Sequence, residues 1–194
     1  MATLSTIPTA AVPATFLDHK AIAEGWRDTF SAEQLNWKPS PKRWSVAECI
    51  QHLNRTTGIY VPALKARLAQ GDLPPGQPPF TYGWFARFTV RSFGPDSSMK
   101  LKAPGVFEPR SEGGPTASGF DPQALVGEFA DLQDQFVALF DAAEGLDLSK
   151  GKMASPAARI FKMPVGAWFE AMAAHQARHL AQAQRVMAEP GFPR

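Results

Sequence analysis

Residues 168–186 read WFEAMAAHQARHLAQAQRV. At about 100° per residue, an α-helix places one apolar stripe along this stretch and the turn before it. Its members are Val165, Trp168, Met172, Ala183 and Val186. His175 and His179 lie four residues apart in the middle of that stripe. Side chains at this spacing share a helix face, with Cβ atoms roughly 6 Å apart, so both imidazoles can reach one metal ion. The stretch therefore predicts an inward-facing helix that carries two candidate metal ligands.

A third histidine lies far upstream, in the stretch WSVAECIQHL at residues 44–53. A helix that begins here has its core positions at Val46, Ile50, Leu53, Thr57, Val61 and Leu64. His52 then falls at the border between core and surface, where a residue that lines a cleft would lie. Two interpretations are open: His175 and His179 are core residues bonded to backbone carbonyls, or all three histidines point into one cleft and bind a metal. A buried ring without a partner costs kilocalories per mole, so either interpretation must supply one.

Three neutral imidazoles form the ligand set of an open zinc-type site, in which water or substrate takes the remaining position. Imidazole also suits nickel, iron, copper and cobalt. We expect a divalent transition metal, zinc or nickel, at His52, His175 and His179. Such an ion lowers the pKa of bound water toward 7, polarises a carbonyl, or holds a thiol as thiolate.

Hydrophobic periodicity predicts four long helices, over about residues 15–30, 45–70, 121–143 and 164–189. The second begins with a capping box, Ser45 followed three residues later by Glu48. Pro62 inside it should kink the helix or break its hydrogen bonding. No stretch of useful length alternates with period two. An all-α fold is expected: a four-helix bundle with one long crossover connection.

The first helix should place its apolar residues in the core: Leu17, Ala21, Ile22, Trp26 and Phe30. His19, between Asp18 and Lys20, is then expected at the surface. Ahead of this helix, residues 1–13 are small, apolar and interrupted by proline, and we interpret them as a flexible arm. Residues 14–190 should form a single domain.

Residues 71–120 form a long connection that is rich in proline and glycine but also in aromatic residues, and residues 81–93 within it predict a short helix. A connection of this length is often functional. It is either an apolar flap that extends the core or covers a dimer surface, or a lid whose aromatic residues contact substrate above the metal. Another connection, residues 147–163, should contain a short helix that starts at Ser155.

Bulk properties exclude several classes of protein. The chain has 194 residues and a formal net charge of +2, with both signs interspersed, which argues against nucleic-acid binding. No apolar run is long enough to span a bilayer. The single cysteine excludes an internal disulfide and fits a reducing compartment. We therefore expect a cytoplasmic protein with a small-molecule substrate, no nucleic-acid or membrane partner, and a homodimer as one option.

The sequence resembles the DinB-like superfamily, the DinB/YfiT-like helical bundles, over about residues 14–188. The resemblance rests on the following residues in this order: Leu35, Lys38-Pro39, Trp44-Ser45, Glu48 and His52-Leu53, then Trp168, His175, His179, Leu180 and Gln182. The middle segment Lys102-Ala103-Pro104, with Phe107 and Pro109, is similar to a connection in one branch of the family. The resemblance implies a four-helix bundle and a three-histidine metal site. Members of this family include transferases that use a low-molecular-weight thiol as cosubstrate, so the resemblance also implies this activity.

Four other residues near the histidines have competing interpretations. Glu48 completes the capping box, or it orients an imidazole or acts as general base. Gln182, one turn beyond His179, could orient that ligand or bond to substrate. Cys49 is a core residue unless it is a fourth ligand, and Arg178 is solvated or forms an interhelical salt bridge.

The sequence thus predicts a metal-dependent enzyme, either a thiol S-transferase or a hydrolase. The alternative is a non-catalytic bundle of the stress response that binds a metal or a small ligand. A third option is an empty site whose histidines serve only as core residues.

Overall fold

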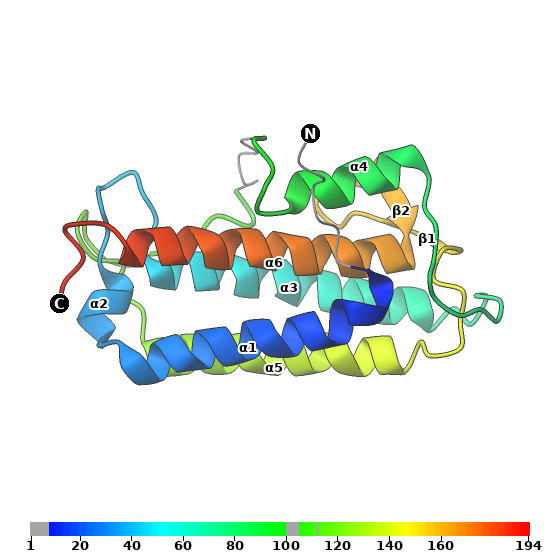
Figure 1. Ribbon diagram of the computed structural model, residues 1–194, viewed down its shortest axis with the longest axis horizontal. Coiled ribbons are helices and arrows are strands. Elements are labelled where there is room, and N and C mark those ends of the chain that lie inside the picture. The colour runs from blue at the N-terminus through cyan, green and yellow to red at the C-terminus, as the bar shows by residue number, and fades with distance from the viewer. Residues whose placement is uncertain (1–7, 100–104, 112) are drawn as a thin grey trace.

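The computed structural model describes residues 8–99, 105–111 and 113–194. Four long helices lie side by side in a bundle (Figure 1): α1 (Val12–Thr29), α3 (Val46–Leu68), α5 (Pro122–Asp141) and α6 (Val165–Met187). The shorter elements are η1 (Thr9–Ala11), α2 (Ala32–Asn36), α4 (Trp84–Phe93), β1 (Lys152–Ala154) and β2 (Lys162–Pro164). The expectation of an all-α fold is confirmed, apart from one small hairpin.

Local sequence signals account for the helix ends. Ser45 and Glu48 form the predicted capping box at the start of α3, and Asp121 accepts a hydrogen bond from the Gln123 amide at the start of α5. Gly71, two residues after the C-cap of α3, has a φ of +65°, which L side chains rarely adopt. α3 itself runs without interruption through Pro62, although the missing N–H of this proline leaves one turn of the helix without its backbone hydrogen bond.

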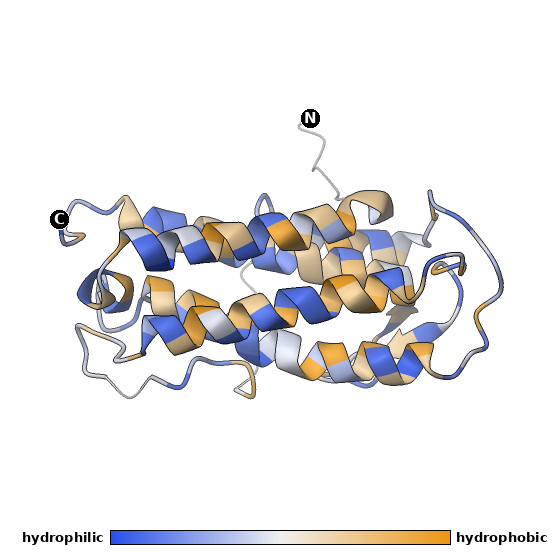
Figure 2. Ribbon diagram, turned by 90° about the horizontal axis from the view of Figure 1, so that it is seen from below, coloured by the Kyte–Doolittle hydropathy of each residue, from blue (hydrophilic) through white to orange (hydrophobic). Residues whose placement is uncertain are grey.

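The core lies between the inner faces of the four long helices. Every apolar position predicted for α3 and α6 is buried, and Figure 2 shows polar and apolar residues together on each long helix, as amphipathic packing requires. Phe16 of α1 and Phe136 of α5 stack with ring centroids 4.5 Å apart. Both rings are fully buried, so they fix the contact between these two helices.

The first helix differs from its prediction in phase and in start. Its buried residues are Val12, Phe16, His19 and Ala23, whereas Leu17 is 46% exposed. The prediction was wrong at Leu17 and Ala21, which are exposed, whereas Ile22, Trp26 and Phe30 pack against the core. Phe16 and Leu17 are adjacent apolar residues, and the phase chosen put the wrong one inside. The correct phase, with spacings of four, three and four, buries His19 rather than leaving it at the surface.

Helical structure also begins earlier than expected. Residues 9–13 belong to η1 and α1, not to a flexible arm, and residues 1–7 lie outside the described part of the chain. Pro13 stands in the first turn of α1, where its missing N–H would have no partner in any case. The proline that was interpreted as an interruption therefore lies within the first turn of the helix.

A two-stranded antiparallel hairpin joins α5 to α6, where no strand was predicted. β1 and β2 pair with Met153 opposite Met163, and the Ser155 amide continues the ladder to the Phe161 carbonyl at 2.8 Å. The short helix expected at Ser155 is therefore absent from this segment. Strands of three residues are too short to show a period-two pattern, which is why periodicity missed them.

The long connection between α3 and α5 contains the predicted short helix, α4, which packs along α6 (Figure 1). Ala86 and Val90 of α4 are buried, whereas Trp84 and Phe88 on its other faces are exposed. Within the described ranges, no helix combines the length and apolar character that crossing a bilayer requires.

Candidate metal centre

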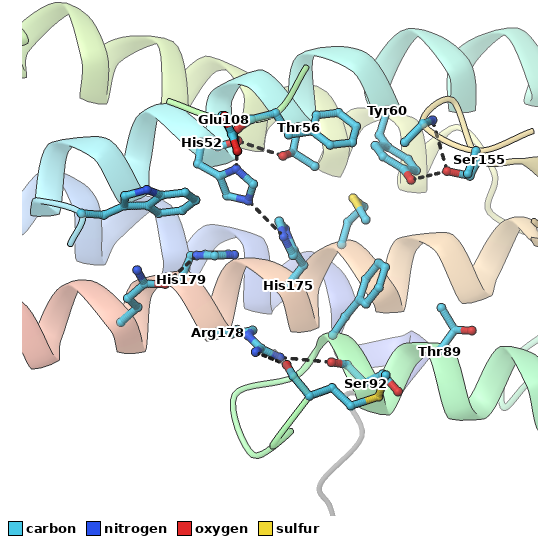
Figure 3. Close-up of a pocket in the computed structure, with 18 of the residues that line it drawn as sticks. His52, Thr56, Tyr60, Thr89, Ser92, Glu108, Ser155, His175, Arg178 and His179 are labelled. Atoms are coloured by element: carbon cyan, nitrogen blue, oxygen red, sulfur yellow. Dashed lines mark hydrogen bonds between the residues drawn. The ribbon is translucent and has the colours of Figure 1, made fainter. Parts of the chain in front are cut away.

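Three histidines from two helices meet between α3 and α6. His52 comes from α3, and His175 and His179 come from successive turns of α6 (Figure 3). One ring nitrogen from each lies within 4.8 Å of the others, and Nε2 of His52 is 3.2 Å from Nε2 of His175. The structure therefore brings together the three residues that the sequence singled out as candidate ligands.

Hydrogen bonds fix which nitrogen of two rings faces the centre. Nδ1 of His52 lies 2.7 Å from the carbonyl oxygen of Phe107, and Nδ1 of His179 lies 3.0 Å from Oε1 of Gln182. Both oxygens only accept, so each Nδ1 carries the proton and donates it. Nε2 of each neutral ring is left with a lone pair, and for His52 this lone pair is directed at His175. This is the arrangement by which outer groups orient histidine ligands for a metal.

The spacing suits one metal ion. Two nitrogens that bind a tetrahedral ion at about 2.0–2.1 Å lie about 3.3 Å apart, close to the 3.2 Å between His52 and His175. Burial lowers the pKa of His52 and lowers that of His175 far below its usual range. Burial and the nearby His52 lower the pKa of His179 to about 3. All three rings are therefore neutral near pH 7, the form in which imidazole binds a metal.

Glu48 lies in the first turn of α3, where its carboxylate is already hydrogen-bonded. Its two carboxylate oxygens accept hydrogen bonds from the Ser45 amide at 2.9 Å and from Nζ of Lys38 at 2.8 Å. The side chain is buried and does not line the cleft beside the histidines. Of its two competing interpretations, the geometry fits capping and leaves no contact with an imidazole.

Cys49 and Arg178 also have defined places. Cys49 is buried in the core, as predicted, and burial raises the pKa of its thiol. Arg178 donates to the backbone carbonyls of Ser92 at 3.2 Å and Met99 at 2.6 Å. It forms no ion pair with any described residue, so the predicted solvated or salt-bridged side chain is instead a link that holds the C-terminal end of α4 against α6.

A cleft of about 960 Å³ opens beside the three histidines, between α3, α4 and α6 (Figure 3). Its volume lies in the range of small-molecule sites. The aromatic residues of the long connection form one wall, with Phe85, Phe88 and Phe93 on α4 and Phe107 farther along. The connection therefore borders the candidate metal centre, as the lid hypothesis requires, and it also extends the core through Ala86, Val90 and Phe107, as the flap interpretation requires.

Two features of the site were not found from the sequence. The indole of Trp44 packs over His52 and His179, with ring centroids 5.0 Å and 5.7 Å away. The carbonyl of Phe107 orients His52, but every residue has a carbonyl, so no residue type could signal it. The resemblance did mark both positions, while its segment Lys102-Ala103-Pro104 lies outside the described residues.

The histidine site can hold a divalent metal and leave one or more coordination positions toward the cleft. Among the described residues no carboxylate or thiol joins the three histidines, so the protein supplies nitrogen ligands alone. Such a site can present a bound water, a bound thiolate or a polarised carbonyl to a molecule in the cleft.

Comparison with known proteins gives the family. No curated protein matches the sequence. YfiT from Bacillus subtilis, described as a probable metal-dependent hydrolase with an unusual four-helix bundle topology, has a similar structure. Its TM-score is 0.61 at 12% identity, over all of this chain and 93% of that one, which shows a shared fold. The family model of the DinB superfamily matches residues 18–183, most of the sequence, so the chain belongs to the DinB superfamily.

Proposed function

We propose that the chain is a metal-dependent enzyme that acts on a small molecule bound in the cleft. The observation that carries this proposal is the convergence of His52, His175 and His179 on one point, with two of the rings held by Nδ1 hydrogen bonds. A non-catalytic metal-binding module would need no opening beside its ion. The cleft of about 960 Å³ that borders the histidines supports the enzyme instead.

The reaction that we favour is transfer of a low-molecular-weight thiol to an electrophile. A divalent ion at this site, zinc or nickel, would hold the thiol as thiolate. No general base is then needed, which agrees with the engagement of Glu48 by Ser45 and Lys38. Cys49 is buried in the core, so the reacting thiol comes from a cosubstrate.

The residues of the chain have separate roles in this proposal. Nδ1 of His52 donates its proton to the Phe107 carbonyl, and Nδ1 of His179 donates to Oε1 of Gln182, so that both Nε2 atoms would be free to bind the ion. Trp44 packs over both rings and excludes water from that side. Removal of water strengthens the electrostatic interactions within the site.

Hydrolysis is the second candidate reaction. It is supported by the likeness to YfiT, which is described as a probable metal-dependent hydrolase. In that case the ion would lower the pKa of a bound water toward 7, and the same three histidines would hold it.

One panel of assays separates these reactions. Protein loaded with zinc or with nickel is tested for conjugation of monochlorobimane with cysteine, glutathione or coenzyme A, and for hydrolysis of 4-nitrophenyl acetate. The proposal expects conjugation that depends on metal and is lost in His175→Ala. Hydrolysis alone would favour the second candidate. Full activity in metal-free protein or in His175→Ala would contradict both.

A further inference from the structure

The histidines divide the cleft into two halves of different chemistry. Along the chain the histidines of α6 follow Trp168 and Met172 and precede Arg185 of the same helix and Glu189, two residues beyond its end; all four of these residues also line the cleft. At a rise of about 1.5 Å per residue, the two pairs lie on opposite sides of the metal centre. The side of the cleft toward the C-terminal end of α6 is lined by charged residues, Arg185 and Glu189 among them. None of the described residues that line the cleft from α4, from the hairpin segment 153–164, or from α6 ahead of His175 carries a charge.

We call this uncharged region the apolar half and define it by Phe85, Phe88, Phe161, Met163, Trp168 and Met172. Phe85 of α4 and Phe161 of the hairpin segment stack with ring centroids 6.1 Å apart, so the long connection and the hairpin form a continuous aromatic wall. Phe88 and Phe161 remain 52% and 50% exposed, although both border the cleft. Their exposed area is available to an apolar ligand.

The hydroxyl groups in this region add little polarity. Thr56, Thr89 and Ser92 each donate to the carbonyl four residues earlier on their own helix, at 2.8 to 2.9 Å. Tyr60 and Ser155 bond to each other at 2.9 Å, and Ser155 also accepts from the Ala157 amide. Each hydroxyl has one proton, so this last pair keeps a single O–H without an acceptor among the described residues.

We propose that the substrate of the site is an apolar molecule whose aliphatic or aromatic body fills the apolar half. Its reacting group reaches the histidines, and the body carries at most one hydrogen-bond acceptor, placed at Tyr60 and Ser155. This inference rests on the proposed function, since it takes the histidines as the reacting end. Apolar surface that leaves water adds about 0.8 kcal/mol per methylene group, which is about a fourfold gain in affinity for each.

The test measures binding without catalysis. The neutral fluorophore N-phenyl-1-naphthylamine is bound to the protein, and straight-chain 2-alkanones from 2-pentanone to 2-nonanone displace it. We expect the affinity for the ketone to rise about threefold to fourfold per methylene group. Phe88→Ser and Phe161→Ser should each lower the affinity for 2-nonanone about tenfold, while Phe88→Leu keeps most of it.

Trp84→Ser is the matched control, because Trp84 is an aromatic residue of the same helix that is 79% exposed and does not line the cleft. The affinity of Trp84→Ser for 2-nonanone should equal that of the native protein. A flat chain-length series, or equal losses in Phe88→Ser, Phe161→Ser and Trp84→Ser, would overturn the inference. Circular dichroism shows whether each variant is folded. If Phe88→Ser is not folded, Phe161→Ser tests the inference in its place.

Metal-free native protein distinguishes this inference from the proposed function. It should still bind the 2-alkanones with the chain-length dependence of the metal-loaded protein, because the apolar half does not include the histidines. If the native protein binds the ketones but never binds a metal, the proposed function fails and the apolar half stands as a ligand site. A metal-dependent enzyme without chain-length dependence would keep the function and overturn the inference.

Discussion

His19 and the three-histidine site lie on different contacts of α6, one with α1 and the other with α3. Burial lowers the pKa of His19 as it lowers those of the other three. The difference lies in the partners. Nδ1 of His19 lies 3.0 Å from Oε1 of Gln176, and no other imidazole is near it in the described structure. His52 and His175 instead direct Nε2 atoms at each other. Burial and a lowered pKa are therefore common to all four histidines, and the convergence of ring nitrogens on one point is what distinguishes the three candidate ligands.

The largest effect should come from His175→Ala compared with His19→Ala. Loss of one of three ligands should weaken zinc affinity at least about a hundredfold, since even an outer-shell change costs tenfold to a hundredfold. His19→Ala should leave the zinc affinity unchanged. Competition with a chelating dye on metal-free protein measures both. Equal losses in the two variants would remove the distinction between the two contacts.

A smaller loss of affinity should follow from changes at Gln182. Gln182→Leu removes the acceptor for Nδ1 of His179, and such outer-shell changes weaken metal binding about tenfold to a hundredfold. Gln182→Glu keeps an acceptor and should keep the affinity. Gln184→Leu, at an exposed position two residues later, is the matched control. If Gln182→Leu binds zinc as tightly as the control, the orientation of His179 does not depend on this hydrogen bond.

His19→Ala should act on stability instead. The change leaves Oε1 of buried Gln176 without its partner, which costs about 1–3 kcal/mol of unfolding free energy. Leu17→Ala on the same helix should cost less, because Leu17 is 46% exposed. Urea unfolding of the metal-free proteins measures the difference. A larger loss for Leu17→Ala would contradict the assigned phase of α1.

The smallest effect concerns pH. The pKa of folded His19 is lowered from its ordinary value of 6.5, so its contribution to stability is complete above about pH 6.5 and is lost as the pH falls through the folded value. One such group gives a slope of at most about 1.4 kcal/mol per pH unit. Metal-free His19→Gln should therefore lose less unfolding free energy between pH 6.5 and 5 than the native protein. Identical slopes would show that His19 is not buried as a neutral ring.

The fold could be predicted from the sequence where the hydrophobic periodicity extends over many residues. α3 and α6 each have 23 residues, and over that length the apolar spacing defined both the helix and its buried face. The predicted phase of the N-terminal half of α1 was wrong because Phe16 and Leu17 are adjacent and the polar His19 occupies a core position. The prediction missed β1 and β2 because a strand of three residues is too short to show a period of two.

The site was predictable as far as side chains define it. His175 and His179 came from helical spacing and His52 from its position at the border of a core face, and the structure brings their ring nitrogens together. The carbonyl of Phe107 belongs to a long connection whose path depends on tertiary packing, so its bond to His52 could not be derived locally. The same holds for the apolar half, because α4 and the hairpin segment meet only in the folded chain.

The most direct test of the account is elemental analysis of the protein purified without chelator, together with His52→Ala, His175→Ala, His179→Ala and His19→Ala. The account predicts close to one divalent transition metal ion per chain in the native protein and in His19→Ala, and loss of that metal in each of the other three variants. A native protein that binds no metal after incubation with zinc or nickel, or variants that retain it fully, would contradict the account.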